Sequence, residues 1–307
     1  MSLMEAVLGS AFAVLERPRW LLLALAGFLA RGGIVVLLIP LVQVPTLAAL
    51  ANLLGPALVG FVFGGVSPGF LVLIGTAVAS LAAGLVLGGL AGAAVDLGLV
   101  REAAATEDLE GVPGPDRGGP GRAVVVRWLA HLPTLIVIVA GASPLVDAVY
   151  QELIHPGDPG VPIFGRIVLR VPAVVVGLLV AWAFGEIIGG LAVRHLAWGS
   201  GAIASLARAV ASLVRPSGLA LAVLSEALLV GAVAVGWIAL AFSFDGVRVL
   251  VRDAAEPWFV ALGMVLLSVA WLAALWLLAV AAAWRSTAWT FEVARHLPDG
   301  TIVHAGG

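Results

Sequence analysis

The chain of 307 residues contains no cysteine and no lysine, and only 11% of its residues are charged. Without cysteine it can form neither a disulfide, nor a thiolate nucleophile, nor a cysteine-ligated metal site. All sixteen basic residues are arginine, which we attribute to coding bias in a GC-rich genome rather than to chemistry. These arginines are dispersed and the net charge is -2, so the composition argues against nucleic acid as a partner.

The motifs of soluble enzymes are also missing from the sequence. There is no Walker A loop, G-x-S-x-G elbow, H-E-x-x-H pair or dinucleotide fingerprint. His155, His296 and His304 lack the spacing of metal ligands. We therefore expect no metal, no cofactor and no enzymatic activity. An intramembrane enzyme using Glu186, Glu226 or Asp96 stays an open alternative.

Apolar residues are abundant: they make up 62% of the chain, and the mean hydropathy is +1.14. Six runs are long enough to cross a hydrocarbon core of roughly 30 Å as helices. The predicted spans are Trp20 to Val44, Gly69 to Val95, Trp128 to Tyr150, Val171 to Val193, Gly218 to Phe242 and Trp258 to Trp284. The predicted fold class is all-α, a polytopic membrane helical bundle forming one integral membrane domain over residues 1–307.

One further apolar segment, Thr46 to Val66, is not counted as a span. Pro45, Pro56 and Pro68 divide it into pieces of about ten residues, which are too short to cross. We predict a re-entrant or interfacial element here, and a spanning one would reverse the orientation of everything that follows.

The distribution of arginine orients the predicted spans, because basic residues are retained on the cytoplasmic side. One side holds Arg17, Arg19, Arg101, Arg117, Arg122, Arg127, Arg194, Arg208, Arg215, Arg285 and Arg295. The other side holds Arg166, Arg170, Arg248 and Arg252. The sequence therefore predicts a protein of the bacterial inner (plasma) membrane with both termini in the cytoplasm.

Two stretches of the chain align without a gap, which indicates an internal repeat. Ala11 to Leu25 matches Ala209 to Val223 and pairs Arg17-Pro18 with Arg215-Pro216. Together with a recurring Gly-Gly-Leu-Ala at Gly88 and Gly189, this predicts three hairpin repeats, at about 1–100, 101–198 and 199–295, with a tail at 296–307. Chance matching in a sequence rich in Ala, Leu and Val is the alternative.

Each hairpin is expected to begin with a cytoplasmic interfacial helix. In the last copy Ile203, Leu206, Val210 and Leu213 line one face, and Ser205, Arg208, Ser212 and Arg215 fall opposite. In the first copy Met4, Leu8, Phe12 and Leu15 form a similar stripe. The alternative is a spanning helix that extends into water. The middle copy departs from this pattern, because Arg101 to Glu110 is acidic and Gly111 to Gly121 is rich in Pro and Gly.

Three charged residues lie deep inside the predicted spans: Arg31, Glu186 and Glu226. A lone charge at that depth costs on the order of 2.5 to 3.5 kcal/mol, so mutual pairing is expected. The cluster is either a static clamp that fixes helix register or a site of proton-coupled transport. Asp96, His131 and Arg194 are secondary polar candidates near helix ends, where snorkelling to headgroups is the default explanation.

Glycines recur every fourth residue at Gly84, Gly88 and Gly92, and again at Gly185 and Gly189. Such stripes let helices approach closely. We favour packing within the chain over a homo-oligomer.

The Arg-Pro steps at Arg17-Pro18 and Arg215-Pro216, with the three-hairpin layout, resemble six-span bacterial membrane proteins similar to the membrane domain found with glycerophosphodiester phosphodiesterases. The soluble phosphodiesterase domain is missing, so the resemblance implies no activity. The expected function is a scaffold or accessory membrane subunit that holds lipid, a protein partner or a second copy. The alternative is a small-solute or proton-coupled transporter, which an odd number of hairpins disfavours.

Overall fold

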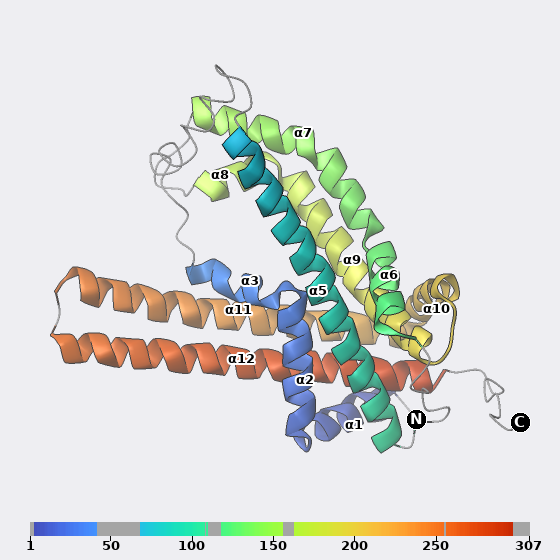
Figure 1. The fold of residues 1–307 in the computed structure, drawn as a ribbon. Helices are drawn as coiled ribbons and strands as arrows, with labels where there is room; N and C mark the ends of the chain where they lie inside the picture. The colour runs from blue at the N-terminus through green and yellow to red at the C-terminus, as the bar shows by residue number, and fades with distance from the viewer. Residues whose placement is uncertain are drawn as a thin grey trace, which may run out of the picture. The chain divides into compact units, whose positions relative to one another are not determined.

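The computed structural model describes residues 3–41, 68–107, 109, 118–155, 163–254 and 256–296. All regular structure in these ranges is helical (Figure 1). Six of the helices are long and apolar enough to cross a membrane. The chain is therefore an all-α integral membrane protein, and the predicted fold class is confirmed.

The helices follow one another with short connections. Their bounds are α1 Leu3–Leu15, α2 Pro18–Phe28, η1 Leu29–Gly33, α3 Ile34–Leu38, η2 Ile39–Leu41, α5 Pro68–Thr106, α6 Pro120–Ala130, α7 Leu132–Ile154, α8 Ile163–Arg170, α9 Pro172–Ala197, α10 Ala202–Val214, α11 Pro216–Arg252 and α12 Pro257–Ala294. Proline is the first residue of α2, α5, α6, α9, α11 and α12. Proline suits this position because the first amides of a helix have no partner inside the helix.

The six candidate spans coincide with the predicted ones but have different ends. They are Pro18–Leu38, Gly75–Thr106, Leu132–Glu152, Pro172–Ala197, Pro216–Arg252 and Pro257–Ala294. The helices α11 and α12 contain 37 and 38 residues, longer than the apolar runs that predicted them. Thr46 to Val66 lies outside the described residues, as do residues 110–117 and the tail after His296.

The first span is not one continuous helix. Between α2 and α3 the backbone leaves helical geometry at Arg31 (φ -81°, ψ 15°) and Gly32 (φ 96°, ψ 3°). A positive φ is strained for residues other than glycine, so Gly32 permits the break. A Cβ on Gly88 of α5 would lie 2.3 Å from the Ala30 carbonyl oxygen. Glycine at position 88 is therefore needed where α5 packs against the break.

The third span also differs from its prediction. The run expected to cross from Trp128 is divided into the short helix α6 and the spanning helix α7, with non-helical backbone at His131 (φ -92°, ψ 5°). Pro133 lies in the first turn of α7, and its ring would clash with a carbonyl four residues earlier in a continuous helix. The middle part of the chain thus has a short helix before its span, which the sequence analysis did not expect.

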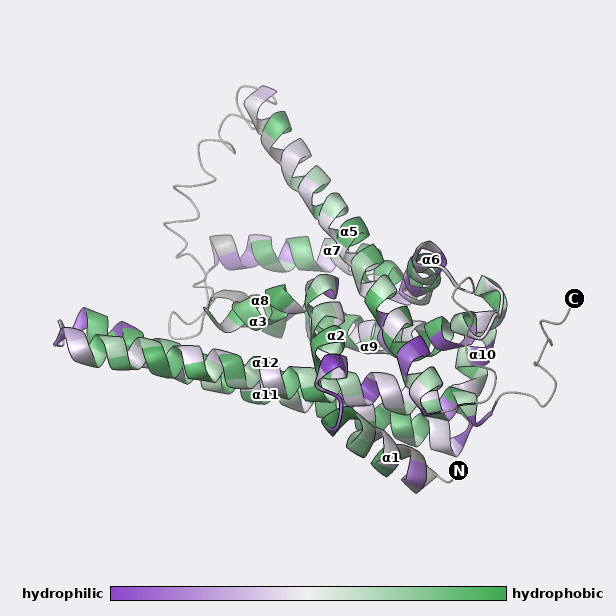
Figure 2. Ribbon diagram, turned by 60° about the horizontal axis from the view of Figure 1, so that its bottom comes forward, coloured by the Kyte–Doolittle hydropathy of each residue, from purple (hydrophilic) through white to green (hydrophobic). Residues whose placement is uncertain are grey.

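The described chain divides into two compact units. One contains Val14–Asp96 and Ala227–Ala283. Within it α11 and α12 run side by side (Figure 1), and apolar residues predominate along both (Figure 2). Leu37 of α3 packs with Leu229 and Leu278 in the core. The Trp237 indole Nε1 donates a hydrogen bond to the Val36 carbonyl at 2.8 Å.

The other unit contains Met1–Ala13, Leu97–Glu226 and Trp284–Gly307. Its central helix is α9, which packs against α6, α7 and α10. At the far end of α7, the buried carboxylate of Glu152 pairs with Arg166 and Arg170 of α8. Two cations compensate this buried charge, and the ion pairs link α8 to α7.

Candidate functional site: a buried ion-pair network

The site lies in the unit built around α9, where Glu186, Gly190 and Arg194 occupy successive turns. Residues four apart share one face of a helix, so these three line a single strip. The neighbouring glycines are close to α6 and the α6–α7 junction. A Cβ on Gly185 would lie 2.8 Å from the His131 ring, and one on Gly189 would lie 3.4 Å from Arg127 Cγ. The glycine stripe of α9 thus packs within the chain, as predicted.

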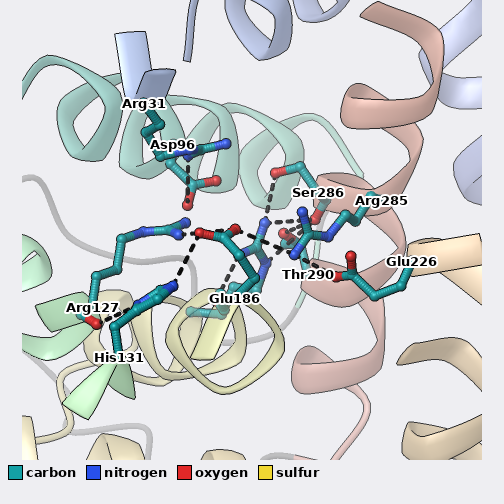
Figure 3. A network of polar contacts seen from close by, with 11 residues as sticks. Arg31, Asp96, Arg127, His131, Glu186, Glu226, Arg285, Ser286 and Thr290 are labelled. Carbon is teal, nitrogen blue, oxygen red and sulfur yellow. Dashed lines mark hydrogen bonds and ion pairs between the residues drawn. The ribbon is translucent and has the colours of Figure 1, made fainter. Parts of the chain in front are cut away.

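Glu186 is the centre of the network and contacts three cationic side chains (Figure 3). Its Oε2 lies 3.7 Å from Arg127 Nη1 and 3.5 Å from Arg285 Nη2, and its Oε1 lies 3.5 Å from His131 Nε2. These distances are those of ion pairs and are too long for strong hydrogen bonds. Glu186 therefore shares its charge among partners from α6, the α6–α7 junction and α12.

Arg285 extends the network to a second carboxylate. Its Nη2 lies 2.6 Å from Glu226 Oε1 on α11, although this contact is not aligned as a hydrogen bond. The side chains of Arg285 and Glu226 are 10% and 13% exposed. Water therefore screens them little, and mutual attraction compensates most of their desolvation.

His131 joins the network at the break between α6 and α7. Its Nδ1 lies 2.8 Å from the Arg127 carbonyl oxygen, while Nε2 faces Glu186. Burial alone would lower the pKa of His131, but the hydrogen bond to Glu186, the bond to the Arg127 carbonyl and the Glu186 charge together raise it. The imidazolium form suits this position because a carbonyl and a carboxylate are both acceptors.

Arg194 and Trp289 support the network from one side. Arg194 is 2% exposed and donates to the Gly190 carbonyl and the Ser286 hydroxyl, both at 2.6 Å. The Trp289 indole donates to Ser225 Oγ at 3.0 Å, and the guanidinium of Arg285 lies 4.4 Å from its ring centroid. A Cβ on Gly190 would lie 2.2 Å from Trp289, so only glycine leaves room for the indole.

Arg31 belongs to the other unit, where it pairs with Asp96. Its Nη1 lies 3.9 Å from Asp96 Oδ2, and Asp96 is 7% exposed. A Cβ on Gly92 would lie 2.6 Å from Arg31 Cγ. Gly88 and Gly92 thus pack within the chain as predicted, whereas nothing lies within 4 Å of a Cβ on Gly84.

The structure joins two of the three predicted charges, Glu186 and Glu226, through Arg285. Sequence reasoning had assigned Arg285 and Arg127 only to the membrane boundary. The signal it missed is that neither proline nor glycine follows Trp284 before Pro298, so the helix continues and carries Arg285 inside. The secondary candidate Arg194 bonds protein acceptors at its buried position, instead of extending to headgroups.

Chemically, the network can hold charges in fixed positions or pass a proton between His131 and Glu186. Among the described residues, no group of three or more acidic or histidine side chains could hold a metal ion. Compared with known proteins, the chain matches no family model, no curated protein and no solved structure.

Proposed function

We propose that this protein is a non-enzymatic integral membrane scaffold or accessory subunit, in which the buried ion network acts as a static clamp. The observation that carries the proposal is the connectivity of Glu186. It contacts Arg127, His131 and Arg285, and Arg285 in turn contacts Glu226. One set of paired charges therefore ties α6, α9, α11 and α12 together.

A clamp is favoured because its charges are buried and have opposite charges beside them. Replacing a buried ion pair with apolar residues is often neutral, but removing one partner leaves a buried unpaired charge, which is expensive. Such a network stabilises one arrangement of its helices against others. A scaffold needs this property, because it must present a constant surface to its partners.

The proposal includes the three-hairpin layout and its orientation. A short helix precedes a spanning helix at α1–α2, α6–α7 and α10–α11, and the short helices have 13, 11 and 13 residues. Proline lies at the start of each following span. These parallels support three copies of one hairpin with their short helices on the cytoplasmic face of a bacterial inner membrane.

The alternative is a small-solute or proton-coupled transporter. Two observations favour it: His131 and Glu186 are titratable groups in contact, and the first span is broken at Arg31 and Gly32. Broken spanning helices often surround the binding sites of transporters.

One experiment on Glu186→Gln separates the two functions. The purified protein is reconstituted into liposomes containing a pH-sensitive dye, and a pH gradient is imposed with and without candidate solutes. A clamp predicts no proton flux above empty liposomes. It also predicts that Glu186→Gln lowers the free energy of unfolding by about 3 kcal/mol, because Arg127 and Arg285 lose a buried partner.

The matched control is Glu256→Gln, which removes the same charge at an exposed position and should leave stability unchanged. A flux that the wild type carries and Glu186→Gln lacks, with stability preserved, would establish the transporter instead.

A further inference from the structure

The short helix α10 turns its small and polar residues towards the protein. Ser205, Ala209 and Ser212 are buried where α10 packs against α9 and α6. Ser205 Oγ donates to the Gly201 carbonyl at 2.8 Å, and Ser212 Oγ lies 3.3 Å from His195 Nε2. The predicted polar face is thus divided, since its serines are covered and its arginines are not.

The opposite side of α10 is apolar and exposed within the described chain. Ile203 and Val214 are each 81% exposed, and Val210 is 46% exposed. Contact of this face with water would be unfavourable in proportion to its apolar area. A hydrophobic layer outside the protein must therefore cover it.

The connections of α10 determine which layer this is. The spanning helix α9 ends at Ala197 and α10 begins at Ala202, while α10 ends at Val214 and the spanning helix α11 begins at Pro216. Both ends of α10 are thus held within a few residues of membrane-crossing helices. This places the apolar face at the bilayer surface.

Arg208 and Arg215 lie on a different side of the helix from the apolar face. They are seven residues apart, which is about two helical turns, and both are exposed. The charges of both act on the His195 imidazole, so they lie near one another. Arg208 Nη1 donates to Ser200 Oγ at 2.6 Å, which holds its guanidinium in place.

We infer that α10 binds acidic phospholipid, with Arg208 and Arg215 at the headgroup phosphate and Ile203, Val210 and Val214 against the acyl chains. Basic side chains beside an apolar helix face match the chemistry of an anionic interface. The inference goes beyond the clamp and does not depend on it, because none of these residues belongs to the ion network.

The test uses the absence of cysteine from the chain. The variant Val214→Cys is labelled with an environment-sensitive fluorophore and reconstituted into phosphatidylcholine liposomes containing phosphatidylglycerol. Quenching is compared for spin-labelled phosphatidylglycerol and spin-labelled phosphatidylcholine at equal mole fraction. We expect apolar, blue-shifted emission and stronger quenching by phosphatidylglycerol.

Replacing both arginines, as Arg208→Gln with Arg215→Gln, should remove this preference. The relative affinity for the acidic lipid is expected to fall roughly fivefold for each arginine. The control Arg248→Gln with Arg252→Gln removes the same charge near the opposite end of α11, where Asp245 and Asp253 lie beside the two arginines. It should keep the preference.

Three results would overturn the inference. Equal quenching by the two lipids would remove the headgroup site. Blue-shifted emission that no lipid quenches would mean that a protein or a second copy covers the face. Emission typical of water would mean that α10 does not lie on the bilayer.

Discussion

Glu186 concentrates the electrostatics of the site in one carboxylate. Its contacts of 3.5 to 3.7 Å with Arg127, His131 and Arg285 are longer than the 2.6 Å contact between Arg285 and Glu226. No single partner neutralises Glu186, so its position depends on several helices at once. Removing this one side chain disturbs more contacts than removing any of its partners.

At the same scale, His131 should make stability depend on pH. Its pKa is raised in the folded protein above the ordinary value of 6.5. The stabilisation it provides is therefore complete below the unfolded pKa and is lost as pH rises through the folded pKa. We expect the wild type to be more stable than His131→Gln by about 1 kcal/mol at mildly acidic pH and the difference to vanish at alkaline pH.

Thermal unfolding of both proteins over a series of pH values measures this difference. The control is His155→Gln, at an exposed histidine outside the network, which should follow the wild-type profile. Parallel profiles for wild type and His131→Gln would show that the imidazole has no favourable charged state here.

Residue identity revealed the cost of Glu186 and Glu226 but not the partner that they share. Hydropathy counting ends a span at its first charge, and so Arg285 was placed at the boundary. The hydroxyls of Ser286 and Thr290 continue α12 beyond that point, since Thr290 Oγ1 bonds the Ser286 carbonyl within the helix at 2.8 Å. Whether Arg31 also acts with the two carboxylates stays a prediction.

Among the elements, the break in the first span depends on one close helix contact. Gly88→Ala would bring a Cβ to 2.3 Å from the Ala30 carbonyl, so the backbone must move. We expect a loss of about 1 to 3 kcal/mol in stability from this overpacking.

Gly84→Ala is the matched control, one turn earlier on α5, where nothing lies within 4 Å of the added atom. It should leave stability unchanged or raise it by up to about 1 kcal/mol, because alanine favours helix. Thermal unfolding in the same detergent or nanodisc compares the two. Equal effects would refute a close packing role for Gly88.

The spans were predictable because about twenty apolar residues in sequence can satisfy their backbone in lipid only as a helix. The breaks at Gly32 and His131 were not, since both depend on local backbone geometry and both lie inside apolar runs. Pro133 was a usable signal for the second break. For the first, Gly32 and Gly33 alone could not distinguish an unwound turn from an ordinary helix.

For the whole molecule, the orientation in the membrane is open to a direct test. Single cysteines at Gly201, between α9 and α10, and at Asp253, between α11 and α12, should lie on opposite sides of the membrane. Both positions are exposed, and nothing lies within 4 Å of a Cβ on Gly201. With a membrane-impermeant maleimide, intact spheroplasts should label Asp253→Cys only.

Inverted vesicles should give the opposite result and label Gly201→Cys only. Reversed labelling would place the termini outside, and labelling of both from one side would contradict the count of spans between them.

The long helices α11 and α12 also bear on the thickness of the bilayer that the protein can occupy. At 1.5 Å per residue, 37 residues extend about 55 Å, against a hydrocarbon core of roughly 30 Å. Exposed apolar side chains continue along α11 from Leu219 to Val251. A thinner or thicker bilayer would still meet apolar surface there. Hydrophobic mismatch should therefore cost this hairpin little, and membranes of different lipid chain length should accommodate it.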